Sequence, residues 1–489
     1  MNQSLHIFRK DIRHLTPELA MYGGLLVTFA VVTPLLWPGA SDSEILQMFA
    51  SLITFLLPVA WLVLVTRIVH EENLVGDQQF WVTRPYQWTS LLGAKLLFLA
   101  VCILVPFGAV QSYFILRAGL ELGPALGSVF LNLFFVGIVL LSFTLLAAVT
   151  AAISRTILAL TILTVGWAGV LVLLDKLTIP RIMPPFVFQT CSVLVAGLLV
   201  GLLIYQYATR HTEHTWRILL LTTAFYFGLY FCCSATNLAG LSGVLIRQHY
   251  PLAKSGTVSL SFTPSSSGPV ARVASGSTNI QEMEPVELPI AYRDADPTAR
   301  VQDASVSFTI DGPDFHYASP WHSLAMESED LILLVPSSVF WRVQGTSVRM
   351  HVSVAAERML PGPPETVKVS DRFRVPDGGV CVLLKRHISG NNLSCWYAGH
   401  GPSPTRVTGP VSGESCGGAT HTSASVIHSL GSGLRVDPVI KSLVSLGGAV
   451  CPGAELTFVP YRSAGNFRLE IDLPPLLLSQ YKPHWLRPD

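Results

Sequence analysis

Several uninterrupted apolar runs in the first half of the chain are long enough to cross a lipid bilayer, which takes about 20 residues. The chain of 489 residues is 50% hydrophobic and only 13% charged, against about 25% charged in typical soluble domains. Runs such as 129–148 are apolar on every side, unlike the one-sided pattern of a surface helix. The sequence therefore predicts a multi-pass α-helical membrane protein and excludes a single soluble domain.

Seven spans are predicted within a transmembrane domain at residues 19–236, each flanked by Pro, Gly or charged residues. They are Leu19–Leu36, Leu46–Val65, Leu91–Phe114, Ala125–Ala152, Ile157–Leu174, Phe186–Tyr207 and Ile218–Ser234. We favour retention of the first span as an anchor over a cleaved signal peptide, because its apolar stretch is long and a long segment precedes it.

The segment before the first span, residues 1–18, is predicted to be an amphipathic helix lying in the membrane surface. Apolar residues recur on one face at helical spacing, with basic residues elsewhere, which is typical of an interfacial helix. The apolar positions are Leu5, Phe8, Ile12 and Leu15, and the basic ones Arg9, Lys10 and Arg13.

The distribution of Lys and Arg predicts the orientation, because these residues concentrate in cytoplasmic loops. With the N-terminus in the cytoplasm, the inner segments hold eight basic residues, or nine with the borderline Lys95, and the short outer loops hold three. The eight are Arg9, Lys10, Arg13, Arg67, Arg84, Arg155, Arg210 and Arg217; the three are Arg117, Lys176 and Arg181. Seven spans then place the polypeptide after residue 236 outside the cytoplasm. We expect the protein to lie in the plasma (inner) membrane.

Beyond the spans the pattern changes from long apolar runs to short alternating ones, as at 305–310, 348–354 and 467–473. Alternation separated by turn residues predicts half-buried antiparallel strands. We therefore expect a tether at 237–277, rich in Ser, Gly and Pro toward its end, and an all-β, sandwich-like extracytoplasmic domain at 278–489. Either one large sandwich or two smaller ones fit its length, with a seam near 361–378.

Four cysteines lie in this polar half: Cys381, Cys395, Cys416 and Cys451. An even number in an extracytoplasmic domain fits two disulfides. Four cysteines permit three pairings, of which nearest neighbours, Cys381–Cys395 and Cys416–Cys451, are our choice; four free thiols are the alternative.

No motif in the chain predicts a catalytic or metal site. The histidines of the polar half lack the short paired spacing of zinc ligands, and the net charge of +1 gives no support for a nucleic-acid partner. The chain also lacks the Gly-Lys pair of a phosphate-binding loop. We expect no enzyme, metal or cofactor on this chain.

The segment between the second and third spans carries the most information about function. It holds acidic residues, a glycine, an aromatic patch, a Thr-Arg-Pro turn and a lysine as the next span begins. These are Glu71, Glu72, Gly76, Asp77, Phe80, Trp81, Thr83, Arg84, Pro85, Trp88 and Lys95. The pattern resembles the first cytoplasmic loop of the type-2 export permeases of ATP-binding-cassette (ABC) transporters, and the resemblance covers about residues 1–210.

The resemblance implies a transport subunit that works as a homodimer or heterodimer of permease chains. A separate ABC ATPase subunit, with ATP and Mg²⁺ bound to it, would press on the loop at 71–88. The family core has six spans, so the seventh span and the outer domain are not explained by it. The chain would move an unidentified substrate or transmit force to its outer domain.

Three other interpretations remain open on the residues alone. The loop at 71–88 can instead be an interfacial helix with its tryptophans among lipid headgroups. The whole protein can be a receptor or scaffold whose outer domain binds a ligand or a cell-envelope component. A membrane glycosyltransferase using Asp42 and Glu44 in the first outer loop is the third.

Overall fold

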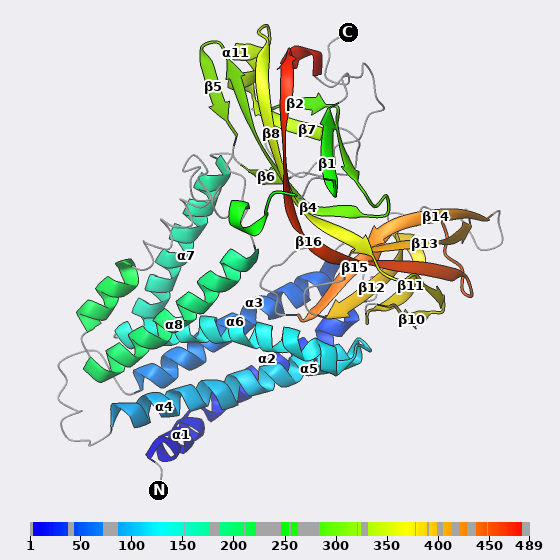
Figure 1. Ribbon diagram of the computed structural model, residues 1–489. Coiled ribbons are helices and arrows are strands. Elements are labelled where there is room, and N and C mark those ends of the chain that lie inside the picture. The colour runs from blue at the N-terminus through cyan, green and yellow to red at the C-terminus, as the bar shows by residue number, and fades with distance from the viewer. Residues whose placement is uncertain are drawn as a thin grey trace. The chain divides into compact units, whose positions relative to one another are not determined.

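The computed structural model describes most of the chain, and its helices and strands are labelled in Figure 1. The described residues are 3–37, 44–71, 87–150, 152–176, 185–209, 212–221, 246–253, 256–262, 283–319, 321–323, 331–376, 378–388, 391–398, 404–412, 420–427, 437–446 and 448–481.

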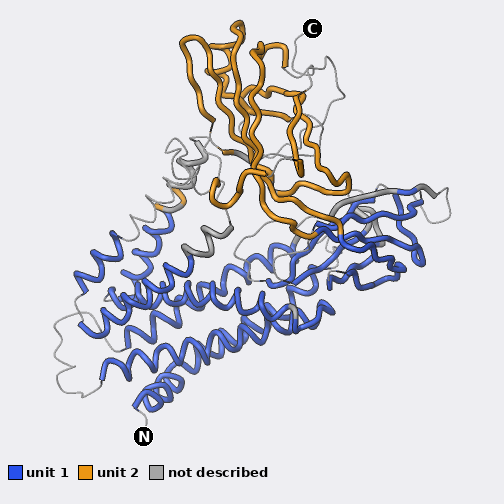
Figure 2. Tube along the Cα trace, viewed as in Figure 1, with its two compact units in different colours: residues 1–165, 189–223, 362–461 blue, residues 166–188, 224–361, 462–489 orange. Residues whose placement is uncertain are grey.

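The chain divides into two compact units, coloured separately in Figure 2. Unit 1 holds residues 1–165, 189–223 and 362–461, and therefore combines most of the apolar helices with part of the β-rich half. Unit 2 holds residues 166–188, 224–361 and 462–489. Each unit is described by itself.

Among the residues that the structure describes, five helical segments are long and apolar enough to cross a membrane, and all five overlap predicted spans. They are Thr16–Leu35, Ile45–His70, Trp88–Arg117, Ala125–Val149 and Ser192–Thr209. The predicted fifth span lies in a helix whose described apolar part is the shorter Ile153–Gly166. The predicted seventh span falls mainly outside the described residues. The described part of the chain thus has five candidate spans, as a membrane domain would.

The helices of unit 1 run back and forth in chain order. They are α1 (Gln3–His14), α2 (Thr16–Leu35), α3 (Glu44–His70), α4 (Trp88–Phe98), the π-helical η2 (Leu99–Leu104), α5 (Val105–Arg117), α6 (Leu122–Val149), α7 (Ile153–Lys176) and α8 (Pro185–Thr209). Helices α7 and α8 extend past the unit boundary. Helix α3 packs against α2 and α6, and α1 packs against α4. One end of the helix bundle, here called the α1 end, therefore contains the start of α2, the end of α3 and the start of α4.

Unit 1 also contains a β lobe, residues 362–461. One antiparallel sheet has the strand order β10–β11–β12–β15. A second sheet region pairs β13 with β14 and with the first residues of β16, which also pair with β9. Buried residues of both sheets, such as Leu393 of β12 and Phe458 of β16, share one core. The strands are β9 (Glu365–Lys368), β10 (Arg372–Arg374), β11 (Val380–Ile388), β12 (Asn391–Ala398), β13 (Thr405–Ser412), β14 (Thr420–Ile427), β15 (Val439–Val444) and β16 (Glu455–Leu476).

Unit 2 is built mainly of strands around a separate core. Alternate residues of β8, from Val348 to Val354, are buried, as the sequence alternation predicts. The core joins β4, β8 and the rest of β16 to two small sheets, β1–β3 and β2–β7. The elements are β1 (Val258–Phe262), β2 (Met283–Leu288), β3 (Ile290–Asp294), β4 (Arg300–Gly312), β5 (Phe315–Ala318), β6 (His322–Ser323), β7 (Leu331–Pro336), α11 (Ser337–Val343), β8 (Val348–Pro361) and η4 (Leu478–Tyr481). The β-rich character of the second half is confirmed.

Candidate coupling site at the α1 end

The predicted loop is described only at its two ends. Glu71 directly follows α3, and Trp88 is the first residue of α4, which also carries Lys95. The other predicted positions, Glu72, Gly76, Asp77, Phe80, Trp81, Thr83, Arg84 and Pro85, lie outside the described residues. The geometry of the site therefore comes from the helices on either side of the loop.

A buried ion pair joins α1 to α4. Asp11 Oδ2 lies 2.9 Å from Lys95 Nζ, and the two side chains are 0% and 2% exposed. Taking two charges out of water is costly, so their attraction and hydrogen bond must offset the lost hydration. An arrangement of α1 that broke this pair would leave a buried charge without compensation, which is costly. The pair therefore favours the observed position of α1 on α4.

The buried face of α1 differs from the predicted one. Its buried side chains are Ile7 and Asp11, and Leu15, directly after the helix, continues the same four-residue spacing, whereas Leu5 is 41% exposed. Phe8 and Ile12 are partly buried against the same core. The apolar pattern alone missed this face because Asp11 is charged, and only a partner distant in sequence makes its burial tolerable.

Two further ion pairs, which are more exposed, connect α1 and α2 to the end of α3. Lys10 Nζ lies 3.5 Å from Glu71 Oε1, and Arg67 Nη2 lies 3.0 Å from Glu18 Oε1. Exposed pairs of this kind contribute only about 0–1 kcal/mol each. The Lys10–Glu71 pair matters for its position, because it links α1 to the first residue of the loop at 71–88.

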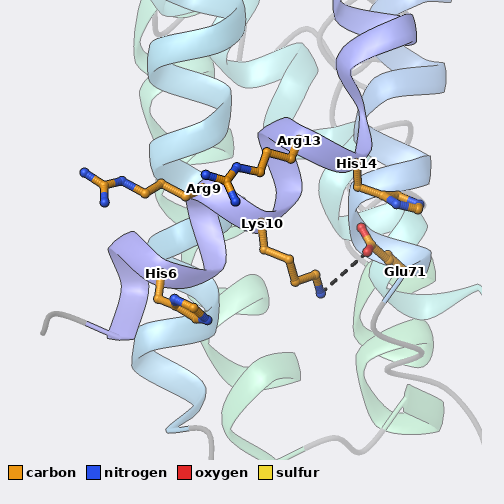
Figure 3. A pocket seen from close by; sticks show the side chains of 6 residues that line it. All are labelled: His6, Arg9, Lys10, Arg13, His14 and Glu71. Carbon is orange, nitrogen blue, oxygen red and sulfur yellow. Dashed lines mark ion pairs between the residues drawn. The ribbon is translucent and has the colours of Figure 1, made fainter.

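A cavity of about 530 Å³ opens beside these pairs, here called the basic cavity. Its described lining consists of five basic or imidazole side chains of α1 and the carboxylate that directly follows α3: His6, Arg9, Lys10, Arg13, His14 and Glu71. Figure 3 shows Lys10 reaching from α1 to Glu71, while the side chain of Arg9 extends away from Glu71. The arrangement is suited to holding an anion.

A second polar cluster at the α1 end joins α3, α6 and α8, and sequence reasoning missed it. His70 Nε2 lies 3.0 Å from the carbonyl oxygen of Ala147. The Gln206 side chain donates to the carbonyl oxygen of Ala148 and accepts a 2.6 Å hydrogen bond from Thr215. These bonds satisfy carbonyl groups at the end of α6 that have no partner within the helix.

At the opposite end of the helices, the β lobe of unit 1 packs against α2 and α5. Trp396 Nε1 of β12 donates to the carbonyl oxygen of Trp37 at 3.3 Å, and Trp37 Nε1 donates to Asp437 Oδ2 at 3.2 Å. The two indole rings lie 6.0 Å apart. Lys441 of β15 donates to the carbonyl oxygen of Leu36, and burial lowers the pKa of its ammonium group. We call this set of contacts the tryptophan clamp.

Arginines of β10 extend the attachment to the turn between α5 and α6. Arg374 pairs with Glu121 at 2.7 Å, and Arg372 donates to the carbonyl oxygen of Arg117. Gly119 in this turn adopts a φ of +74°, and a Cβ there would lie 2.5 Å from Arg372 Nη2. Only glycine combines this backbone conformation with such close approach.

The cysteine prediction is confirmed for one pair. Cys381 and Cys395 are direct partners on β11 and β12 and form a disulfide, with Cα atoms 4.0 Å apart. Cys451 is also disulfide-bonded. Its predicted partner, Cys416, lies outside the described residues, so the second pairing stays a prediction.

Within the described ranges, no three His, Cys, Asp or Glu side chains gather as a metal site would require. Comparisons with protein-family models, curated proteins and solved structures find no match to this chain.

Proposed function

We propose that the chain is the membrane subunit of a type-2 ABC export system, in which a separate ATPase acts on the segment 71–88. The observation that carries the proposal is the attachment of α1 to both flanks of this segment. The buried Asp11–Lys95 pair holds α1 to α4, and the Lys10–Glu71 pair connects it to the end of α3. A push on the segment would therefore displace α1, α3 and α4 together instead of bending a free loop.

In this proposal the N-terminus is cytoplasmic, the β-rich half is extracytoplasmic, and two permease chains form the working unit in the inner membrane. The helices form a permease-like core, and the β-rich half is sandwich-like. The tryptophan clamp and the Arg372 hydrogen bond support a role in force transmission, because they attach the β lobe to the ends of α2 and α5 that lie far from α1. Movement of these helices would reach the β lobe through side chains packed within one core.

A receptor or scaffold is the second candidate, and one cavity favours it. A space of about 770 Å³ lies between α2, α3 and the β lobe of unit 1. Its lining combines Phe29 and Phe55 with the charged Asp437 and Lys441. Mixed apolar and charged linings of this size suit small-molecule ligands.

Co-purification tests the transport proposal. A tagged chain should bring down a phosphate-loop ATPase, and Trp81→Ala combined with Arg84→Ala should release it, because interface energy concentrates in Trp and Arg side chains. Trp341→Ala with Arg342→Ala is the matched control, since this neighbouring pair lies on α11 in unit 2. If the wild-type chain brings down no ATPase, or the loop variant keeps it with normal coupled turnover, the proposal fails. The receptor alternative predicts no ATPase in either sample.

A further inference from the structure

The basic side chains of α1 form a continuous surface that the coupling role does not require. His6, Lys10 and His14 follow one another at four-residue spacing, and Arg9 and Arg13 form the adjacent row. Residues spaced by four lie one above another on a helix. All five side chains are exposed, while the opposite side of α1 is buried. The helix therefore carries its positive charge on one side only.

The basic cavity has an unbalanced charge. Among the lining residues that the structure describes, Arg9, Lys10 and Arg13 carry positive charges and Glu71 carries a negative one. These four described side chains together have a formal net charge of +2. At about 530 Å³ the cavity is far larger than a single water molecule, which occupies about 30 Å³ of liquid. A phosphate group together with neighbouring glycerol atoms fits this combination of volume and charge.

The position of the cavity identifies the source of the phosphate. Helix α1 leads through Leu15 directly into the candidate span Thr16–Leu35, and Glu71 directly follows the candidate span Ile45–His70. The cavity thus lies where two spans end, which is the level of the lipid headgroups. Leu5, beside the Arg9–Arg13 row of α1, is 41% exposed and suits contact with acyl chains.

We propose that the basic cavity binds the phosphate headgroup of an anionic membrane phospholipid. Arg9 and Arg13 contact the phosphate through paired hydrogen bonds, which a guanidinium forms with phosphate oxygens. Lys10 supplies the third cation, and Glu71 competes with the lipid for it, because Glu71 Oε1 lies 3.5 Å from Lys10 Nζ. Removal of the Glu71 charge therefore strengthens lipid binding. The proposal does not depend on an ATPase.

Native mass spectrometry of the purified full chain, titrated with dioleoyl phosphatidylglycerol, tests the site. Arg9→Gln with Arg13→Gln should weaken binding by about tenfold or more, since each basic residue near an anionic surface contributes about a fivefold factor. Glu71→Gln should strengthen binding several-fold. Arg155→Gln with Arg217→Gln is the matched control, because both arginines are exposed and lie outside the cavity lining. The control should bind like wild type.

Three results would overturn the proposal. The first is equal binding by the wild-type chain and the Arg9/Arg13 variant, and the second is equal retention of dioleoyl phosphatidylcholine. The third is displacement of phosphatidylglycerol by millimolar inorganic phosphate, which would assign the cavity to a soluble phosphate compound. Loss of binding in the Glu71→Gln variant would contradict the competition between Glu71 and the lipid. All four substituted arginines are exposed, so folding is not expected to confuse the comparison.

Discussion

Replacing Lys95 by Met should release α1 from the helix bundle. The substitution keeps the length of the side chain but leaves the Asp11 carboxylate buried without its partner at 2.9 Å. Breaking a buried ion pair in this way typically costs about 3–5 kcal/mol. Since about 1.4 kcal/mol corresponds to a factor of ten, the docking equilibrium of α1 should shift by about a hundredfold or more. Lys10 cannot compensate fully, because it is 42% exposed and 4.0 Å from Asp11.

Hydrogen–deuterium exchange of the peptide covering residues 3–14 measures this shift directly, since amide protection reports local opening. Exchange in Lys95→Met should be about a hundredfold or more faster than in wild type. The double variant Asp11→Leu with Lys95→Met buries no charge and should return close to the wild-type rate. Arg217→Met is the control, because it breaks the exposed pair with Glu213 and should change little.

Two outcomes would refute the reasoning. Wild-type exchange in Lys95→Met would mean that the pair does not hold α1. An equally fast exchange in the single and double variants would mean that lost packing, and not the buried charge, explains the effect.

Three further predictions concern the β-rich half. Cys381→Ser opens a disulfide whose cysteines are 14 residues apart and should cost about 3 kcal/mol; a denaturant titration showing an unchanged midpoint would disprove it. Arg358 hydrogen bonds hold the pKa of Asp294 at about 2, below its ordinary 3.8. That stabilisation is complete above pH 4 and lost as the pH falls toward 2, so Asp294→Asn should flatten the pH dependence of thermal unfolding over this range. Trp396→Ala removes a buried ring and its bond to Trp37 and should cost about 3–5 kcal/mol; wild-type resistance of the β lobe to proteolysis would exclude this loss.

Local pattern was sufficient for most of the fold. Long apolar runs and strict alternation are properties of neighbouring residues, so five spans and the alternating part of β8, residues 348–354, could be predicted from sequence. The length of β16, Glu455–Leu476, could not be predicted in this way. Its 22 residues pair with strands that are distant in sequence, such as β8, β9 and β13.

The site was predictable only in part, for the same reason. Lys95 was singled out by its place in a loop pattern, but Asp11 was missed because a charged residue within an amphipathic helix is normally exposed. The tryptophan clamp joins residues 359 positions apart, and nothing local to Trp37 or Trp396 indicates the other. Buried polar contacts depend on tertiary packing, which a single sequence does not encode in a readable pattern.

The most direct test of the central claim is photo-crosslinking from position 81 in living cells. A photoreactive phenylalanine replacing Trp81 should crosslink to a phosphate-loop ATPase, and the same probe at Trp341 should not. The account predicts that the crosslinked ATPase disappears when Arg84 is also changed to Ala. Crosslinks from position 81 that reach only lipid would contradict the coupling role and identify the segment as a headgroup anchor.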